Sequence, residues 1–473
     1  MERLITFICN SELISTKVNP AETVLDFLRN RRKLTGTKEG CREGDCGACT
    51  IILGSLQKGK VNYKTVNSCL LPLADLQGKH LVSIEGLNVD GLNYIQEQMI
   101  DEGGTQCGFC TPGFIISLTN YFINNTEYSA EEAASSLDGN ICRCTGYAGI
   151  IRAAVNTVNL LRVMKISKSG TIPYLIERKI LPGYFLEIPK RLRALNKEIK
   201  GKKPASYSGV VAGGTDLFVQ NWEALLEKEN NFISENPDLK FINRKRNRIH
   251  IGGAVTVSEI CSSKEINKYY PQLRNSLKYF GSMPIRNRAT VAGNIVNASP
   301  IADLVNIFIA LDAVIHLASK RGIRPVPIKN FYKAYKTLDK KRDEIVKEIS
   351  LPVPTKNLLF NFEKVSRRAH LDIASVNSSI ALKYEKGKIK DVSISAGGVA
   401  PVPLFLKSTS EFLTGKEINN SILIETLKIA GSEVSPITDA RGSKEYKSLL
   451  LCQLIKSHFL KFFPDLINEE VLR

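Results

Sequence analysis

The sequence predicts a multidomain α+β protein, and three observations support this prediction. The chain has 473 residues, too many for one ordinary domain. Its hydrophobic fraction of 43% is typical of folded chains. The local pattern changes from short apolar runs to helical periodicity, and then to mixed strands and helices. We expect a β-rich domain at 1–85, a helical domain at 86–162, a linker at 163–205, an α+β domain at 206–352 and its C-terminal lobe at 353–473.

The first domain is expected to be a small sheet crossed by one helix. Val24, Leu25 and Leu28 share a helical face within Thr23–Arg31, which predicts the helix. Short apolar runs predict strands at Leu4–Cys9, Thr50–Leu53, Lys60–Val66 and Leu81–Ile84.

The second domain is expected to contain four short helices. Pro112 suits the first turn of a helix, and Ser129 with Glu132 three residues later has the pattern of a capping box. The helices are predicted at Asn93–Met99, Pro112–Ile123, Ser129–Leu137 and Gly149–Leu161.

Residues 163–205 contain 11 Lys and Arg, three Glu and three prolines before Pro204, which favours a solvated linker. The α+β part begins near Tyr207, and a break near Ser350–Pro354 separates its two lobes. Its strands are predicted at Val210–Ala212, His250–Ala254, Ala313–Leu317 and Lys390–Ala396, and its helices at Asp216–Leu226, Val257–Ile260 and Ile301–Leu311.

The net charge of +18 lies entirely in the second part of the chain. Residues 1–160 hold 14 basic and 17 acidic side chains, so residues 161–473 carry a net +21. This charge suits an anionic cofactor, a dinucleotide or an acidic partner. No nucleic-acid partner is expected, because the sequence has no helix-turn-helix, zinc-finger or aromatic platform pattern.

The N-terminal residues show no secretory signal, and polar residues interrupt the longest apolar region, 301–318. We therefore expect a cytoplasmic protein without a membrane span. In a reducing compartment, eleven cysteines favour metal ligands or catalytic thiols over disulfides.

The first cysteine group is Cys41, Cys46 and Cys49, with Cys69 further along the chain. This C-x4-C-x2-C spacing with a distant fourth cysteine is that of plant-type [2Fe–2S] sites. Glycines within the loop let backbone N–H groups approach the sulfurs. Zinc and reactive thiols are the alternatives, but structural zinc usually has paired short spacings.

The second group pairs Cys107 with Cys110 and Cys142 with Cys144. Spacing alone leaves a [2Fe–2S] cluster and a zinc site open. Each pair precedes a predicted helix, whose N-terminus favours negative thiolates. Cys9, Cys261 and Cys452 fit no motif and are expected to be small buried apolar residues.

The segments Gln106–Gly113 and Cys142–Tyr147 resemble the second cluster of the molybdenum hydroxylase superfamily, and the whole chain resembles the family's iron–sulfur/FAD part. The resemblance implies a β-grasp ferredoxin-like domain, a four-helix cluster domain, and a PCMH-type FAD domain with a CO dehydrogenase flavoprotein C-terminal-like lobe. It also places Gln106 at the edge of a molybdopterin bound mainly by another chain.

Two small-residue loops in the third domain suggest a flavin site. The first is Val210, Val211, Ala212, Gly213, Gly214, Thr215, Asp216 and Leu217. The second contains Thr290, Gly293 and Asn294. Either loop alone could be an ordinary tight turn. Glycines before a helix can bring N–H groups to a pyrophosphate, and Asp303 could accept hydroxyls of a ribityl or ribose group.

In this order the two loops resemble the family's FAD domain. The resemblance further implies Phe280 on the isoalloxazine ring, Val346 beside the adenine or flavin, and Lys364 near the flavin. Ala292 stands where relatives often have a second glycine. Residues 369–372 are less acidic than in several xanthine dehydrogenases, which leaves the choice between NAD and O₂ open.

The implied function is an electron relay, with no catalytic acid or base on this chain. Electrons from purine hydroxylation on a molybdenum-binding partner would pass through the clusters to FAD and then to NAD, in an α₂β₂ assembly. One alternative is the same relay for an aldehyde or N-heteroaromatic substrate. The others are a non-catalytic redox sensor or assembly protein, and a zinc-binding scaffold.

Overall fold

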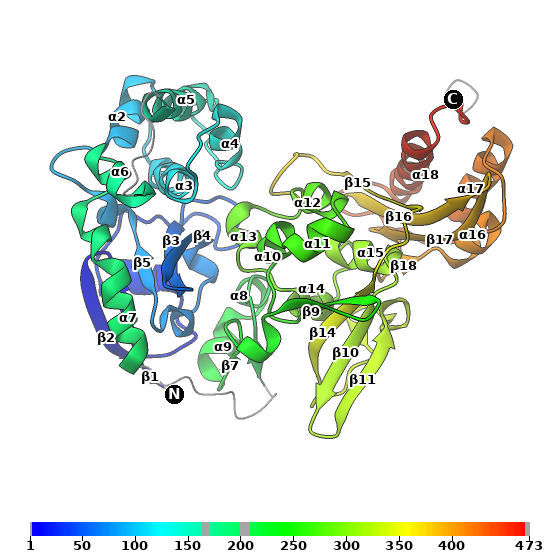
Figure 1. The fold of residues 1–473 in the computed structure, drawn as a ribbon, viewed down its shortest axis with the longest axis horizontal. Coiled ribbons are helices and arrows are strands. Elements are labelled where there is room, and N and C mark those ends of the chain that lie inside the picture. The colour runs from blue at the N-terminus through cyan, green and yellow to red at the C-terminus, as the bar shows by residue number, and fades with distance from the viewer. Residues whose placement is uncertain (1, 163–169, 199–208, 469–473) are drawn as a thin grey trace. The chain divides into compact units, whose positions relative to one another are not determined.

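The structure is a computed structural model that describes residues 2–162, 170–198 and 209–468. The chain divides into two compact units, each described by itself below (Figure 1). Unit 1 comprises Met1–Phe232 and Ser282–Arg288, and unit 2 comprises Ile233–Gly281 and Ala289–Arg473. The start of the predicted FAD domain therefore belongs to the unit that carries the cysteine groups.

The first domain of unit 1 is built on a five-stranded sheet with the order β2-β1-β5-β3-β4. Its strands are β1 (Arg3–Cys9), β2 (Glu12–Val18), β3 (Thr50–Gln57), β4 (Lys60–Asn67) and β5 (His80–Val82). Strand β2 pairs antiparallel with β1 from Arg3↔Val18 to Cys9↔Glu12, and β1 pairs parallel with β5. The predicted helix is present as α1 (Val24–Asp26), capped by Thr23, followed by a π-helical turn over Phe27–Arg31. The sequence predicted every strand except β2.

All four helices of the second domain are present. They are α2 (Tyr94–Asp101), α3 (Thr111–Asn124), α4 (Ala130–Ser135) and α5 (Ala148–Arg162). Pro112 lies in the first turn of α3, as predicted. Ser129 Oγ accepts the Glu132 N–H at 3.4 Å, which is one of the two hydrogen bonds of the predicted capping box. Buried apolar residues of these helices form one core cluster.

The expectation of a solvated tether is wrong for residues 170–198. This segment forms α6 (Thr171–Glu177), a 3₁₀ turn (Gly183–Leu186) and α7 (Ile188–Glu198). In α7 the basic residues face outward, while Ile188, Leu192 and Leu195 are buried together with Ile8. The prediction failed because the charge count hid an amphipathic spacing of i, i+4 and i+7. Residues 163–169 and 199–205 lie outside the described residues.

The remaining elements of unit 1 are short. Strands β6 (Val210–Val211) and β7 (Asn231–Phe232) pair parallel, and α8 (Leu217–Gln220) and α9 (Trp222–Glu227) replace the single helix expected over Asp216–Leu226. Helix α13 (Met283–Arg286) contacts β4.

Unit 2 contains two larger antiparallel sheets and a short two-stranded ribbon. The first sheet has the order β11-β10-β14-β9-β8, and the second has the order β15-β16-β17-β18. The strands are β8 (Ile242–Lys245), β9 (Arg248–Gly252), β10 (Val314–Ser319), β11 (Gly322–Pro327), β12 (Tyr332–Ala334), β13 (Thr337–Leu338), β14 (Ile345–Pro352), β15 (Leu358–Val365), β16 (Val376–Glu385), β17 (Lys388–Gly397) and β18 (Leu404–Phe405).

Helices line both larger sheets of unit 2 (Figure 1). They are α10 (Val257–Ser262), α11 (Lys264–Tyr269), α12 (Gln272–Leu277), α14 (Val291–Asn297), α15 (Asp303–Ala310), α16 (Lys407–Leu413), α17 (Asn420–Ser432) and α18 (Lys444–Phe462). Helix α15 contacts β16 and β17, and α18 contacts β15 and β16. Strand β14 ends at Pro352 and β15 begins at Leu358, so the predicted break near Ser350–Pro354 is a link between two sheets.

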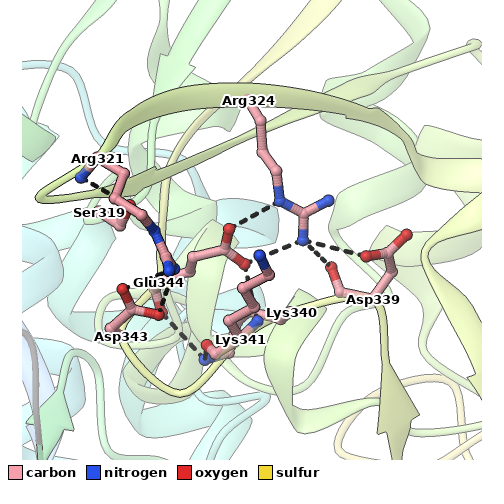
Figure 2. A network of polar contacts seen from close by, with 8 residues as sticks. All are labelled: Ser319, Arg321, Arg324, Asp339, Lys340, Lys341, Asp343 and Glu344. Carbon is pink, nitrogen blue, oxygen red and sulfur yellow. Dashed lines mark hydrogen bonds and ion pairs between the residues drawn. The ribbon is translucent and has the colours of Figure 1, made fainter.

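A polar network closes the turn before β14 (Figure 2). The Arg324 guanidinium donates to both carboxylate oxygens of Glu344 at 2.7 and 2.9 Å. It also donates to Oδ1 and the backbone oxygen of Asp339, at 3.0 and 2.8 Å. The hydrogen bond from Arg324 lowers the pKa of Glu344 to about 2. Among the helices of the described residues, none combines the length and apolar composition needed to cross a lipid bilayer.

Candidate functional site

The first cysteine group lies in a loop before β3 and a short helical turn after β4. Cys41 and Cys46 are half-buried, and Cys49 and Cys69 are buried with their sulfurs 3.3 Å apart. The Glu43 N–H donates to Cys41 Sγ at 3.3 Å. Two glycines of this loop, Gly44 and Gly47, have φ of +79° and +70°, a backbone conformation that favours glycine.

In this group the electrostatics lower the pKa of Cys41 and Cys49 and raise that of their neighbours Cys46 and Cys69. A hydrogen bond from the Cys46 thiol, joined by N–H groups of the loop, lowers the pKa of Cys41 to about 5. A hydrogen bond with Cys69 lowers the pKa of buried Cys49, with help from Asn67, whose Nδ2 donates to Cys49 Sγ at 3.8 Å. A thiolate is the form that ligates metals.

The second cysteine group surrounds the N-terminus of α3 and the turn before α5. Cys110 is the N-cap residue of α3, so the pair Cys107 and Cys110 precedes a helix, as the sequence predicted. Cys107 and Cys144 are exposed, with their sulfurs 3.6 Å apart. Burial and a hydrogen bond with Cys142 raise the pKa of Cys110 to about 12. Burial alone would raise the pKa of Cys142, but bonds from the Thr145 hydroxyl and N–H lower it.

Both groups are arranged as two pairs of sulfurs. The pairs are Cys41 with Cys46, Cys49 with Cys69, Cys107 with Cys144, and Cys110 with Cys142. A tetrahedral metal about 2.3 Å from each ligand holds two sulfurs about 3.7 Å apart, close to the 3.3 and 3.6 Å observed.

The pairing distinguishes a two-metal cluster from a single ion. Four sulfurs bound to one zinc ion would all lie about 3.7 Å from one another. Two bridged irons instead need two separate pairs of sulfurs, one pair for each iron. Within the described part of the chain, one group of three or more His, Cys, Asp or Glu residues has ligand atoms that all lie within 4.8 Å of one another. That group contains no cysteine, so neither cysteine group is gathered around a single point. The donor sets therefore fit [2Fe–2S] clusters.

A direct contact joins the two cysteine groups. The Ile141 N–H donates to the backbone oxygen of Cys46 at 3.0 Å, and Ile141 directly precedes Cys142. The Asn140 side chain donates to Gly47 O at 3.1 Å. A Cβ added to Gly113 of α3 would lie 2.3 Å from the same oxygen, so the loop packs against a helix that must have glycine there.

The first predicted flavin loop follows β6 in unit 1. Val210 and Val211 form the strand, Ala212, Gly213, Gly214 and Thr215 form the turn, and Asp216 and Leu217 begin α8. Gly214 has φ of +77°, and a Cβ there would lie 2.9 Å from the Phe218 ring. Phe218 belongs to the buried cluster that contains Cys49, Cys69 and Leu70. The loop thus shares a core with the first cysteine group.

Sequence reasoning missed the side chain that fixes this loop. Arg288 Nη2 donates to Gly213 O at 2.9 Å and forms an ion pair with Asp75 at 2.5 Å. Arg288 and Asp75 are both buried. No local sequence pattern predicts this contact, because Asp75, Gly213 and Arg288 lie far apart in the sequence.

The second predicted flavin loop lies in unit 2. Thr290 is the N-cap of α14, and its Oγ accepts the Gly293 N–H at 3.2 Å. Asn294 Oδ1 is buried without a hydrogen-bond partner among the described residues. A Cβ on nearby Gly253 would meet Val346 O at 2.3 Å. The orphaned amide oxygen and the close backbone fit a loop that receives a polar ligand.

Two other predicted flavin residues, Asp303 and Lys364, contact each other. Lys364 Nζ lies 2.8 Å from Asp303 Oδ2 and also donates to Tyr279 O at 2.8 Å. Asn377 Nδ2 donates to Asp303 Oδ1 at 2.5 Å. Burial raises the pKa of Asp303, although Lys364 opposes this effect. Both carboxylate oxygens of Asp303 thus already have protein partners.

The remaining predicted residues differ in exposure. Phe280 is half-buried after α12, Val346 is buried on β14, and Gln106 is exposed beside Cys107. Among the three cysteines without a motif, Cys9 is buried, whereas Cys261 and Cys452 are half-buried. Burial raises the pKa of Cys9 to about 12, as expected for an inert core thiol.

Four family models match the chain in consecutive segments. They are described as a 2Fe-2S iron-sulfur cluster binding domain (7–74), a [2Fe-2S] binding domain (83–155), an FAD binding domain in molybdopterin dehydrogenase (189–354) and a CO dehydrogenase flavoprotein C-terminal domain (361–462). The chain therefore carries [2Fe–2S]-binding and FAD-binding domains, which confirms the predicted fold class.

The curated relatives are longer proteins. Xanthine dehydrogenase 1 of Arabidopsis thaliana is 33% identical over 93% of this chain, and aldehyde oxidase 1 of Macaca fascicularis is 25% identical over 99%. The chain spans 38% and 40% of these two proteins. The solved structure of a carbon monoxide dehydrogenase from Hydrogenophaga pseudoflava has a similar fold, with 23% sequence identity and a TM-score of 0.50. The matched region covers 53% of the present chain and 87% of the dehydrogenase chain.

Proposed function

We propose, because the chain belongs to the molybdenum hydroxylase family, that it carries electrons between a molybdenum site on a partner chain and an FAD that it binds itself. The clusters supply one-electron carriers, and the flavin supplies the junction between one-electron and two-electron chemistry. The protein's own contribution is to hold these groups close together and to tune them by burial and hydrogen bonds.

The proposed ligands of the first cluster are Cys41, Cys46, Cys49 and Cys69, and those of the second are Cys107, Cys110, Cys142 and Cys144. The paired sulfurs support this assignment. The proposed flavin contacts are the two loops, 210–217 and 290–294. They are supported by Gly214 in a left-handed conformation and by the unpartnered Asn294 oxygen.

One observation carries the proposal that electrons pass between the clusters. The hydrogen bond from Ile141 N–H to Cys46 O links the residue next to Cys142 with a ligand of the other cluster. The whole connection lies within unit 1. With both clusters bound, covalent bonds and this one hydrogen bond would connect a ligand of one cluster to a ligand of the other.

The exposed side of the second cluster is proposed to face the partner. Cys107 and Cys144 are exposed, and so are Phe109 and Tyr147 beside them, at 45% and 39%. Exposed aromatic side chains of this kind are common in protein interfaces. The first cysteine group is more buried and shares a core with Phe218 at the flavin loop, so it is proposed to stand between the second cluster and FAD.

We further propose a purine substrate of the xanthine dehydrogenase type, with NAD as electron acceptor. The support is that matched xanthine dehydrogenases reach 33% identity, against 25% for aldehyde oxidases, so an aldehyde substrate is the second candidate. The family resemblance also leads us to propose a partner chain that holds the molybdenum site, in an α₂β₂ assembly. We propose a cytoplasmic location, because none of the eleven cysteines is part of a disulfide bond.

Anaerobic NADH titration of the purified chain tests the relay from its acceptor end. NADH should bleach the visible bands of flavin and clusters together, because electrons entering at FAD reach both clusters. Bleaching of the flavin alone would contradict the internal relay. If dithionite bleaches all bands but NADH bleaches none, the acceptor assignment is wrong and the relay stands. With the partner added, xanthine should produce the same bleaching, and an aldehyde should not.

Ile141→Pro tests the route between the clusters. Proline has no N–H, so this variant loses the bond to Cys46 O, whereas the matched Ile141→Val variant keeps it. Rapid-freeze EPR after mixing with NADH should show slower reduction of the second cluster in Ile141→Pro only. Equal rates in both variants, at equal iron content, would remove this bond from the route.

A further inference from the structure

A second kind of metal-binding arrangement lies on the first sheet of unit 2, apart from all cysteines. His250 on β9, His316 on β10 and Glu348 on β14 stand on three adjacent strands. His316 is directly opposite Glu348 in the register, and His250 is opposite Ser350, two residues along β14. The three side chains therefore share one face.

This face is turned away from the apolar core of the sheet. Along β9, half-buried His250 stands between fully buried Ile249 and Ile251. Along β10, half-buried His316 stands between buried Ile315 and Leu317. Because side chains alternate along a strand, both imidazoles project from the face opposite these residues.

The ligand atoms are already close together. One ligand atom from each of His250, His316 and Glu348 lies within 4.8 Å of the other two. His250 Nδ1 is 2.8 Å from Glu348 Oε1, and the two imidazole rings are 5.8 Å apart. The His250 and Glu348 side chains are 14% and 13% exposed, so they are held in place yet reachable by an ion.

Neighbouring groups orient the site and limit its charge. Ser350 Oγ lies 2.9 Å from His316 Nε2, as an outer partner that fixes the ring of a ligating histidine would. Arg248 Nε donates to the same Oγ at 2.9 Å and brings a positive charge beside the site. The Lys347 ammonium also acts on His316 electrostatically. An ion bound here must overcome this charge, which predicts a moderate affinity.

We propose that His250, His316 and Glu348 bind a divalent transition-metal ion of the zinc class, with a position left for water. Two imidazoles and one carboxylate are a ligand set that zinc uses in sites with three protein ligands. Two nitrogen ligands of three disfavour Mg²⁺ and Ca²⁺, which prefer oxygen. The bound ion links β9, β14 and β10, so it stabilises this sheet. The site does not depend on the proposed electron relay.

The test uses the full chain with its clusters and flavin in place, so that the eight cysteines are occupied. After dialysis against Zn²⁺ and removal of free ion, elemental analysis should find one zinc per chain. The variants His250→Gln and Glu348→Gln should each lose it, with affinity reduced more than about 100-fold, since even outer partners of ligands cost 10–100-fold. His370→Gln, which removes an imidazole of unit 2 outside the site, should keep the zinc.

Copper provides a geometric readout that folding defects cannot imitate. Oxidised [2Fe–2S] clusters and oxidised flavin give no EPR signal, so added Cu²⁺ is seen alone. The spectrum should show hyperfine splitting from two nitrogens, reduced to one in His316→Asn, which is a second variant in case His250→Gln misfolds. Arg248→Gln should bind Zn²⁺ more tightly, because it removes the adjacent charge. Zinc retained equally by wild type and both histidine variants, or by none of them, would overturn the proposal.

Discussion

Replacing Arg288 by alanine should both destabilise unit 1 and loosen the first flavin loop. The Arg288 and Asp75 side chains are 7% and 3% exposed, and they form an ion pair at 2.5 Å. The same Arg288 nitrogen donates to Gly213 O at 2.9 Å. Asp75 follows Cys69 closely in the chain, so this one guanidinium fixes the flavin loop against a segment that carries a cluster ligand.

The expected magnitude follows from this burial. Removing one partner of a buried ion pair costs about 3–5 kcal/mol, because the other charge stays in a medium of low dielectric constant. For a unit of about 240 residues, each kcal/mol lowers the melting temperature by about 2–4 °C. The Arg288→Ala variant should therefore melt roughly 6–20 °C below wild type.

Visible circular dichroism of the clusters is the assay, because all eight proposed ligands belong to unit 1. The double variant Arg288→Met with Asp75→Leu removes both charges and should recover most of the melting temperature, since apolar replacement of a buried pair is often neutral. It still lacks the donor to Gly213 O, so its FAD dissociation constant should rise about fivefold, equivalent to ~1 kcal/mol.

Two results would refute this reasoning. The first is an Arg288→Ala variant that melts within about 2 °C of wild type. Such a shift is smaller than the one expected from a loss of about 1 kcal/mol in the free energy of unfolding. The second is a double variant with wild-type FAD affinity, which would mean that the bond to Gly213 O does not shape the flavin loop.

Three further predictions concern single contacts. Cys69→Ser should lower the iron content from about four to about two per chain, with the EPR signal of the second cluster intact. Arg324→Ala removes the guanidinium at the centre of the contacts in Figure 2 and should lower the free energy of unfolding at pH 7 by about 1 kcal/mol, because Arg324 is 37% exposed. The folded-state pKa of Glu344 lies near 2, below its usual 4.5. The stabilisation from this ion pair is therefore present above pH 4.5 and is lost as the pH falls towards 2. Urea titrations of wild type and variant at pH 7 and pH 2 check this prediction. Lys364→Met leaves the Asp303 carboxylate buried without its cation, so urea unfolding should show a loss of about 3–5 kcal/mol that Asp303→Asn largely restores in the double variant.

Local patterns predicted the parts of the fold that local forces determine. Cysteine spacing predicted two groups, in each of which the structure brings sulfurs close together, and helical periodicity predicted all four helices around the second group. Strand β2 was missed because its side chains are mostly exposed and polar, as in Glu12–Val18 at a sheet edge. The hydrogen bonds to β1 hold β2 in an extended conformation that its own composition does not predict.

Contacts between distant segments could not be predicted in this way. The inclusion of residues 209–232 and 282–288 in unit 1 depends on packing of Phe218 and Ile285 with Leu70, which no window of sequence reveals. The same holds for Arg288 with Asp75, and for the His250, His316 and Glu348 group. Asp303 was predicted as an acceptor for hydroxyls and Lys364 from the resemblance, but their mutual ion pair emerged only from the fold.

The most direct test of the central claim is metal, sulfide and flavin analysis of the chain purified without oxygen. The proposed function predicts about four irons, four acid-labile sulfides and one FAD per chain, with two distinct S = 1/2 EPR signals after reduction. A folded, colourless preparation that contains zinc but neither sulfide nor flavin would contradict it.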